Sequence, residues 1–365
     1  MSVISLSTSP AVSERAQLRQ QILDLSTRPP EQRAFAQLAL AVFRYQAVHN
    51  PLYATYLRYR RVPSNAVTDL TQIPFLPIGF FKSHAVLTNA QPSDVRLQFA
   101  SSGTTSEQTS RHAVPDPDLY ERVSTGLFEK TYGPLHNVPI LALLPSYLER
   151  NNSSLVYMVR RFMQQSGAAE SGFFLNDYAQ LTDALRRLYE RAPDQRILLI
   201  GVTFGLLDWA ESADDLTFLG KNPNLIVMET GGMKGRRREL LREEVHALLT
   251  DRLGVSAVHS EYGMTELLSQ AYSPGEGVFG PSATLRILLR DVNDPFTIYA
   301  ETGTGSRQTS ERRTGGINVI DLANLDSCSF IETQDLGQYA GTDGSFRVIG
   351  RFDNSDVRGC NLMVI

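Results

Sequence analysis

Apolar side chains recur at helical spacing in the first part of the chain. Ser13 is placed to cap one such segment, and a second begins after Pro29-Pro30. The apolar positions of the two segments are Leu18, Ile22 and Leu25, and then Phe35, Leu38, Val42 and Tyr45. Positions three and four residues apart lie on one face of a helix, so the pattern predicts two helices within a helical region of residues 1–70.

The pattern changes from Leu97 onward, where short apolar runs alternate with helical stretches. The runs that predict buried strands are 139–144, 196–202 and 224–228. The helical stripes are Tyr178, Leu181, Leu185 and Leu188, and then Leu241, Val245, Leu248 and Leu249, which Gly254 is placed to end. Strands that alternate with helices predict an α/β fold with parallel-rich sheets flanked by helices.

Two other stretches depart from this alternation. Residues 73–78 are apolar but twice interrupted by proline, which predicts a buried connector or an edge segment. From about Ala283 strands and turns dominate, and residues 339–348 predict a hairpin with Asp343-Gly344 at its turn. Residues 301–313 are polar and glycine-rich, as expected of a loop.

Composition narrows the class of protein. The 365 residues carry 35 basic and 39 acidic side chains, a near-balance that argues against a general nucleic-acid binder. No apolar run approaches the roughly 20 residues that cross a bilayer, and the first 15 residues predict no secretory signal. The only two cysteines, Cys328 and Cys360, lack the spacing of a zinc site, so we expect free thiols and a cytoplasmic location.

Three short segments carry candidate chemistry. The first, Ser101-Ser102-Gly103-Thr104-Thr105, follows an apolar run and offers hydroxyl and backbone N–H groups to phosphate oxygens. No lysine follows, so the segment is not a P-loop, and an ordinary turn is the alternative.

The second segment, residues 261–266, follows a strand-like stretch, 255–259, where open α/β sheets place ligands. An aromatic ring stacks on adenine, threonine bonds phosphate and glutamate holds Mg²⁺, although a turn with a solvated glutamate has the same composition. The third segment joins Asp335, expected at a strand end, to Arg351 beyond the hairpin; carboxylate and guanidinium groups suit ribose and phosphate. A turn and a surface arginine are the alternative here.

The order of these segments resembles the adenylate-forming superfamily of acyl-CoA synthetases, peptide-synthetase adenylation domains and luciferases. The resemblance covers about residues 101–359. Within it, the chain is more similar to the acyl-protein synthetase family, the fatty-acid activating component of bacterial bioluminescence. The segments that carry this closer likeness are 73–77, 80–82, 99–105, 229–236 and 356–360.

The resemblance implies an adenylate-forming core over residues 1–350, with a β-rich part from about 283. It also implies that residues 351–365 are a hinge-like stub and that the C-terminal lid of most relatives is largely absent. The implied activity uses ATP and Mg²⁺ to convert a carboxylic acid, expected to be fatty, to acyl-AMP. The acyl group would then pass to Cys360 and on to a protein partner, such as a reductase or an acyl-carrier protein.

The resemblance also assigns roles to individual residues. Glu266 would bind Mg²⁺, Thr265 would touch the α-phosphate, and Asp335 would hold the ribose with Arg351 beside it. The residues implied in contacts with the phosphates and the adenosine are Ser101, Ser102, Gly103, Thr104 and Thr105, and Gly231, Gly232, Tyr262 and Gly263. A strand-end turn is an equal explanation of the glycine pair at 231 and 232.

Two departures from the superfamily pattern bear on catalysis. The phosphate loop lacks its usual lysine, and a missing lid would remove another. Adenylation builds negative charge that cations must offset, so we hypothesise that Lys82, Arg111 or Lys234 supplies one. Thioester formation requires a thiolate. A plain terminal cysteine is the alternative for Cys360, but the likeness of Arg358-Gly359-Cys360 to the family implies that Cys360 is the acyl carrier, and Cys328, which has no such context, is expected to be structural.

Two rival functions stay open. One is an acyl-CoA or acyl-carrier ligase that needs no reactive Cys360; the other is a degenerate nucleotide-binding homologue that cannot adenylate. Three histidines lie near the motifs, His84, His112 and His259, and none is expected to be catalytic. The aromatic residues Phe80, Phe81, Phe204 and Trp209 either line an acyl pocket or belong to the core.

Overall fold

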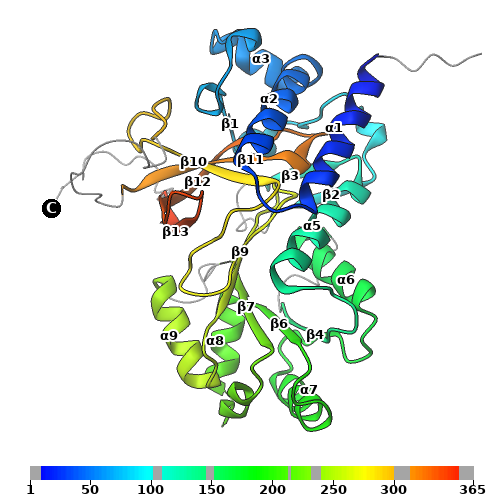
Figure 1. The fold of residues 1–365 in the computed structure, drawn as a ribbon, viewed down its shortest axis with the longest axis vertical. Coiled ribbons are helices and arrows are strands. Elements are labelled where there is room, and N and C mark those ends of the chain that lie inside the picture. Colours follow the sequence, from blue (N-terminus) through cyan, green and yellow to red (C-terminus); the bar gives the residue numbers. More distant parts are fainter. Residues whose placement is uncertain are drawn as a thin grey trace, which may run out of the picture.

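The fold is taken from a computed structural model, which describes residues 10–101, 109–144, 152–212, 215–231, 240–299 and 313–352. Two larger sheets form an upper and a lower part of the molecule, and helices cover both (Figure 1). The helices are α1 (Pro10–Ser26), α2 (Gln32–His49), α3 (Pro51–Tyr59), α4 (Phe80–Ser83), α5 (Pro117–Tyr132), α6 (Ser154–Ser166), α7 (Tyr178–Arg191), α8 (Thr203–Ser212) and α9 (Arg242–Leu253).

The two predicted N-terminal helices are confirmed as α1 and α2, and the apolar positions named for them are buried. The expected cap is wrong, because α1 begins at Pro10 and Ser13 lies inside it. Proline suits the first turn of a helix, where its missing N–H would have no partner in any case. The rings of Phe43 on α2 and Tyr53 on α3 pack on Phe330 at 5.7 and 6.1 Å, which joins α2 and α3 to the upper sheet.

The lower sheet is the predicted parallel one, with strand order β5-β4-β6-β7-β8-β9. Its strands are β4 (Ile140–Leu143), β5 (Gly172–Phe173), β6 (Ile197–Val202), β7 (Leu225–Thr230), β8 (His259–Tyr262) and β9 (Ala271–Ser273). Pairing is parallel from β5 to β8, and only β9 runs antiparallel. Helices α8 and α9 lie on one side of these strands and α5 and α6 on the other (Figure 1). Strands buried on both faces read as continuous apolar runs, which is why the sequence pattern found β4, β6 and β7.

Two predictions need correction, one for helix α9 and one for strand β8. Gly254 does end α9 in the left-handed conformation, at φ 68°, but Leu241 and Leu248 are 61% and 45% exposed. The buried face of α9 instead carries Val245, Leu249 and Leu253, because the neighbouring α8 sets which stripe is covered. Strand β8 begins at His259, later than the predicted 255–259, so that Tyr262 is its last residue.

The upper sheet has the order β1-β12-β11-β10, with β13 paired to β12. Its strands are β1 (Leu76–Pro77), β10 (Leu285–Arg290), β11 (Gly315–Asp321), β12 (Phe330–Tyr339) and β13 (Phe346–Arg351). The proline-interrupted segment forms the edge strand β1, as predicted. The hairpin of β12 and β13 is also confirmed, with Gly344 at φ 88° in its turn. Asp335 lies within β12 rather than at a strand end, since β12 continues to Tyr339.

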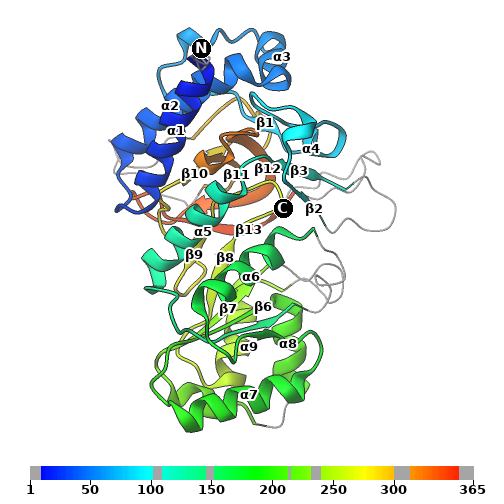
Figure 2. The same ribbon diagram turned by 90° about the vertical axis from the view of Figure 1, so that its right-hand side faces the viewer.

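A third, two-stranded sheet pairs β2 (Leu97–Ala100) with β3 (Arg111–Val114) in antiparallel fashion. Figure 2 shows this hairpin at the level where the upper and lower parts meet. The hairpin holds the two ends of the Ser/Thr/Gly loop together, because Ala100 pairs with Arg111. None of the helices that the structure describes is both long and apolar enough to span a bilayer.

Candidate functional site

The candidate site lies where the carboxyl ends of the parallel strands meet the β12–β13 hairpin. Strands β6, β7 and β8 end at Val202, Thr230 and Tyr262, and all three ends lie at one edge of the lower sheet. Open α/β sheets bind their ligands at this edge. Tyr262 then joins the two sheets, because its hydroxyl donates a hydrogen bond to Oδ2 of Asp335 on β12 at 2.9 Å.

Asp335 is the centre of the first cluster. It is 7% exposed, and Arg351, its cross-strand neighbour on β13, approaches Oδ1 with Nε at 3.2 Å. Burial raises the pKa of Asp335, while the positive charge of Arg351 and the Tyr262 hydroxyl oppose that rise. The structure therefore brings together three of the residues named from the sequence, Tyr262, Asp335 and Arg351.

The ring of Tyr262 is held edge-on by aromatic neighbours. The rings of Phe279 and Phe346 lie 5.8 and 5.6 Å from it, and these two stack on each other at 5.3 Å. The guanidinium carbon of Arg242 lies over the ring of Phe279, 5.0 Å from its centroid. This packing fixes the direction of the Tyr262 hydroxyl, and neither phenylalanine nor Arg242 was among the site residues predicted from the sequence.

Glu266 forms the second cluster, with residues of the β2–β3 hairpin. Its carboxyl group is 5% exposed, and burial raises its pKa, opposed by a hydrogen bond with the Ser110 hydroxyl and by the charge of Arg351. Ser110 in turn closes the Ser/Thr/Gly loop, because its N–H donates to Oγ of Ser101 at 3.0 Å and its carbonyl accepts from the Ser101 N–H at 3.0 Å. The ends of the predicted phosphate loop and the predicted metal ligand are thus direct neighbours.

The backbone of residues 264–269 is held by buried side chains from other elements. His112 on β3 lies with Nδ1 2.9 Å from the Thr265 carbonyl oxygen. Asn324 donates from Nδ2 to the Glu266 carbonyl at 2.8 Å, and Asp321 accepts from the N–H groups of Leu268 and Ser269 at 2.7 and 3.0 Å. The sequence analysis mentioned only His112 among these three, and as a residue near a motif.

A buried acidic cluster lies behind the ends of β7 and β8. Glu229 accepts a hydrogen bond from the Thr203 hydroxyl at 2.7 Å and pairs with Nε of Arg242 at 3.1 Å. Burial favours its neutral form, but hydrogen bonding by His246 and the charge of Arg242 outweigh this and lower the pKa of Glu229. Gly231, which follows β7 with φ 79°, accepts from the same Thr203 hydroxyl through its carbonyl at 3.0 Å.

Glu261 is the second member of this acidic cluster. The Thr230 hydroxyl donates a hydrogen bond to Oε2 of Glu261 at 2.5 Å. The other carboxylate oxygen, Oε1, lies so close to Gly263 that a side chain at position 263 would collide with it. Burial and the charge of Glu229 raise the pKa of Glu261 to about 7, with the Thr230 hydroxyl acting in the opposite direction. Glu229 directly precedes the last residue of β7, and Glu261 directly precedes the last residue of β8. Only burial in the tertiary structure distinguishes these two side chains from solvated glutamates.

The other residues named from the sequence are exposed, belong to the core or lie outside the described residues. Lys82 on α4 and Arg111 at the start of β3 are both exposed. The candidates that lie outside the described residues are Ser102, Gly103, Thr104, Thr105, Gly232, Lys234 and Cys360. Cys328 is buried, and burial raises the pKa of its thiol to about 12, which suits its predicted structural role. The aromatic residues Phe81, Phe204 and Trp209 are core residues, each at most 1% exposed.

No group of three or more His, Cys, Asp or Glu side chains within the described ranges is arranged to hold a metal ion by itself. Mg²⁺ usually takes only one or two carboxylates and keeps phosphate and water oxygens as its other ligands. A single buried Glu266 with a raised pKa fits that kind of site, since a bound cation would favour its charged form.

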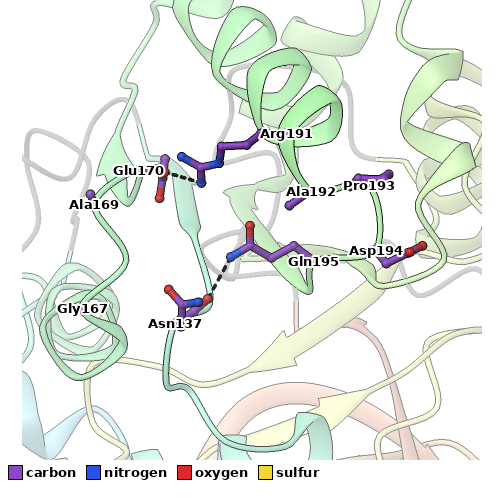
Figure 3. Close-up of a pocket in the computed structure, with 9 residues that line it drawn as sticks. All are labelled: Asn137, Gly167, Ala169, Glu170, Arg191, Ala192, Pro193, Asp194 and Gln195. Carbon is purple, nitrogen blue, oxygen red and sulfur yellow. Dashed lines mark hydrogen bonds and ion pairs between the residues drawn. The ribbon is translucent and has the colours of Figure 1, made fainter.

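A cavity of about 680 Å³ lies away from the candidate site, at the opposite edge of the lower sheet. Its lining residues Asn137, Glu170 and Gln195 precede β4, β5 and β6, so the cavity faces the amino ends of these strands (Figure 3). Glu170 pairs with Arg191 at 2.5 Å, and Gln195 donates to the Asn137 carbonyl at 3.1 Å. The polar groups of these two pairs thus bind each other.

Comparison with known proteins gives matches among solved structures. No family model and no curated protein sequence matches the chain. Among solved structures, a 2-hydroxyisobutyryl-CoA ligase, solved in the postadenylation state in complex with R3-HIB-AMP, is similar with a TM-score of 0.61 and 11% sequence identity. The similarity covers 90% of this chain and 70% of that one. At this identity the likeness concerns the fold, and the chain therefore has the α/β fold of an adenylate-forming ligase.

Proposed function

We propose that this chain activates a carboxylic acid with ATP, forming an acyl adenylate and releasing pyrophosphate. One observation carries the proposal: Tyr262, Asp335 and Arg351 are in contact at the carboxyl edge of a parallel sheet, and the charges of Asp335 and Arg351 act on the buried Glu266. These are the residues to which the motif resemblance assigns ribose, adenine and Mg²⁺ contacts. Their agreement with the fold of a solved acyl-CoA ligase supports the same chemistry here.

The geometry suits nucleotide binding on the Asp335 side. A carboxylate accepts hydrogen bonds from both hydroxyls of a ribose, and Asp335 is held for this by Tyr262 and Arg351. Arg351 has a side chain 68% exposed, so it remains accessible to ribose or phosphate oxygens. Gly263 and Gly231 let the backbone approach the adenosine, in line with the sequence prediction.

The Glu266 side suits the phosphates. In the reaction a substrate carboxylate oxygen bonds to the α-phosphorus while the bond from that phosphorus to the pyrophosphate oxygen breaks. Bound Mg²⁺ would offset the negative charge that builds on the phosphoryl oxygens. Glu266 holds a carboxylate toward this position, and Ser110 orients it. Thr265, the neighbouring residue, would donate from its hydroxyl to the α-phosphate, and Lys82, Arg111 or Lys234 stays the proposed source of a further cation.

The activity should be tested by exchange of radioactive pyrophosphate into ATP, with carboxylic acids of graded chain length. We expect acid-dependent and Mg²⁺-dependent exchange. Asp335→Asn should lower it at least tenfold, because the amide loses the charge-assisted hydrogen bonds to ribose but keeps an acceptor for Tyr262. Glu170→Gln, in the remote cavity, is a matched loss of one carboxylate and should leave exchange unchanged. No exchange with any acid, despite ATP binding, would favour the degenerate homologue.

The acyl acceptor is a separate part of the proposal. The resemblance supports transfer from acyl-AMP to the Cys360 thiolate, with loss of AMP, and then to a reductase or carrier-protein partner. The similarity to a CoA ligase supports free CoA as the alternative acceptor. Labelling with a radioactive fatty acid and ATP separates the two: hydroxylamine-labile label on the protein that disappears in Cys360→Ser supports the first, whereas turnover with CoA that survives this substitution supports the second.

A further inference from the structure

Two buried polar side chains at the start of β3 face the loop of residues 264–269. Ser110, directly before the strand, and His112, its second residue, are buried, and Arg111 between them is exposed. Ser110 bonds the carboxyl group of Glu266, and Nδ1 of His112 lies 2.9 Å from the carbonyl oxygen of Thr265. The strand that follows the phosphate loop therefore also contacts the two residues proposed to bind the α-phosphate and the metal.

The protonation state of His112 follows from its surroundings. A carbonyl oxygen can only accept a hydrogen bond, so Nδ1 of His112 carries a proton and donates it to Thr265. The side chain is wholly buried, with the ring of Phe81 edge-on at 5.5 Å. Burial lowers the pKa of His112 to about 4, against the opposing effect of the Thr265 carbonyl and the Asn324 side chain. The imidazole is thus neutral near pH 7, with a single donor directed at Thr265.

His112 acts together with two other buried side chains, those of Asn324 and Asp321. Asn324 donates to the carbonyl of the next residue, Glu266, and Asp321 accepts from the N–H groups of Leu268 and Ser269. His112, Asn324 and Asp321 are all at most 1% exposed. Moving any of these three side chains away from the loop would leave buried polar groups unpaired, which costs more than an ordinary hydrogen bond contributes.

We propose that His112 is a positioning residue for the nucleotide site: its Nδ1–H fixes the Thr265 carbonyl and thereby the directions of the Thr265 hydroxyl and the Glu266 carboxylate. Because His112 lies two residues beyond the closed end of the Ser101–Ser110 loop, it also sets the distance between the phosphate loop and the metal ligand. The consequence for Mg·ATP rests on the proposed function, whereas the effect on the loop does not.

The loop effect is tested in the ligand-free protein by hydrogen exchange of the amides of residues 264–269. His112→Phe keeps a planar ring without a donor, and we expect exchange at these amides to become about tenfold faster or more. His112→Asn places an N–H donor close to the position of Nδ1 and should restore slow exchange. His259→Phe removes a half-buried imidazole, one that contacts Tyr132 instead, and should leave these amides unchanged.

Two outcomes would overturn the proposal: wild-type exchange at residues 264–269 in a folded His112→Phe variant, or equal exchange in the Asn and Phe variants. If His112→Phe does not fold, the comparison of His112→Asn with His112→Gln replaces it. The glutamine donor is one methylene further from the backbone, so only the asparagine variant should keep slow exchange.

The nucleotide effect is measured by equilibrium binding of ATP at graded Mg²⁺ concentrations and by pyrophosphate exchange. We expect His112→Phe to raise the KM for Mg·ATP about tenfold and to leave the KM for the carboxylic acid unchanged, with His112→Asn close to wild type. An equal rise in both KM values would contradict a role in positioning the metal–phosphate loop. A wild-type protein that binds no ATP would refute the proposed function, while the hydrogen-exchange result would still decide the effect of His112 on the loop.

Discussion

Glu261 shows how its neighbours set the chemistry of a single carboxyl group. Glu229, on the adjacent strand, is ionised because Arg242 and His246 lie beside it. Glu261 receives only the Thr230 hydroxyl among the described contacts and feels the negative charge of Glu229. Two buried glutamates in one cluster therefore have pKa values displaced in opposite directions, a pattern typical of functional sites.

This displacement predicts a pH dependence of stability. The pKa of Glu261 is about 7 in the folded protein and 4.5 ordinarily, so between these values the folded protein keeps a proton that the unfolded chain has lost. Its contribution is therefore largest below pH 4.5 and is lost as the pH rises to 7. The free energy of unfolding of Glu261→Gln, measured relative to that of the wild type, should therefore rise by ~1–3 kcal/mol from pH 5 to pH 8.

Urea unfolding at the two pH values measures this difference. Desolvation lowers the pKa values of His112 and His259 to about 4 in both proteins, so their effect cancels in the comparison. Exposed Glu190→Gln on α7 serves as the control and should show no such change. A gap between wild type and Glu261→Gln that stays the same at both pH values would contradict the prediction.

At the scale of elements, helix α1 is fastened to the rest of the fold by ion pairs. Arg15 bridges Asp116, which precedes α5, and Asp326, at 2.9 and 2.5 Å. Arg19 adds a contact to Asp116 at 2.7 Å. Burial alone would raise the pKa of Asp116, but the hydrogen bonds from Arg19 and Arg15 and the Leu119 N–H lower it to about 2. Asp116 thus both joins α1 to α5 and caps the start of α5.

The two roles of Asp116 can be separated by substitution. Asparagine is a good N-cap, so Asp116→Asn should cost only the ion pairs, ~1 kcal/mol at this partial exposure. Asp116→Ala also loses the cap and should cost ~2 kcal/mol. Urea unfolding at pH 7 measures both. High salt should reduce the cost of the asparagine variant, because screening weakens the ion pairs in the wild type; equal costs for both variants would exclude the capping role.

At the scale of the whole molecule, the candidate site depends on two sheets that are separate in the hydrogen-bonding pattern. Tyr262 comes from the lower sheet, Asp335 and Arg351 come from the upper one, and the β2–β3 hairpin lies beside their meeting point (Figure 2). A nucleotide bound here would contact the lower sheet, the upper sheet and the β2–β3 hairpin. The arrangement explains why residues far apart in sequence are brought together.

Mg·ATP should therefore stabilise both sheets at once. A ligand at about 100 times its Kd raises the free energy of unfolding by about 2.7 kcal/mol. We expect this rise together with slower hydrogen exchange in residues 264–269 and in the β12–β13 hairpin, and its loss in Asp335→Asn. Protection confined to one sheet would show that the nucleotide does not bridge them.

The sequence by itself determined the elements with a strong hydrophobic period. The buried strands β4, β6 and β7, the helix α7 and the β12–β13 hairpin follow from apolar runs, stripes and an Asp-Gly turn. Tyr262, Asp335 and Arg351 were also identified from the sequence, because the order of motifs ties them together. The resemblance already implied that Arg351 lies beside Asp335, and the register of the hairpin supplied the contact itself, from Nε to Oδ1 at 3.2 Å.

Only the tertiary structure decided which polar residues are buried and what they face. His112, Asn324, Asp321, Glu229 and Glu261 have no sequence signal that separates them from solvated residues of the same type. Their roles depend on contacts between elements that are 13 or more residues apart, such as Glu229 with Arg242 and His112 with Thr265. Hydrophobic periodicity reports which face of an element is covered, whereas the pKa of a buried group depends on the particular atoms that cover it.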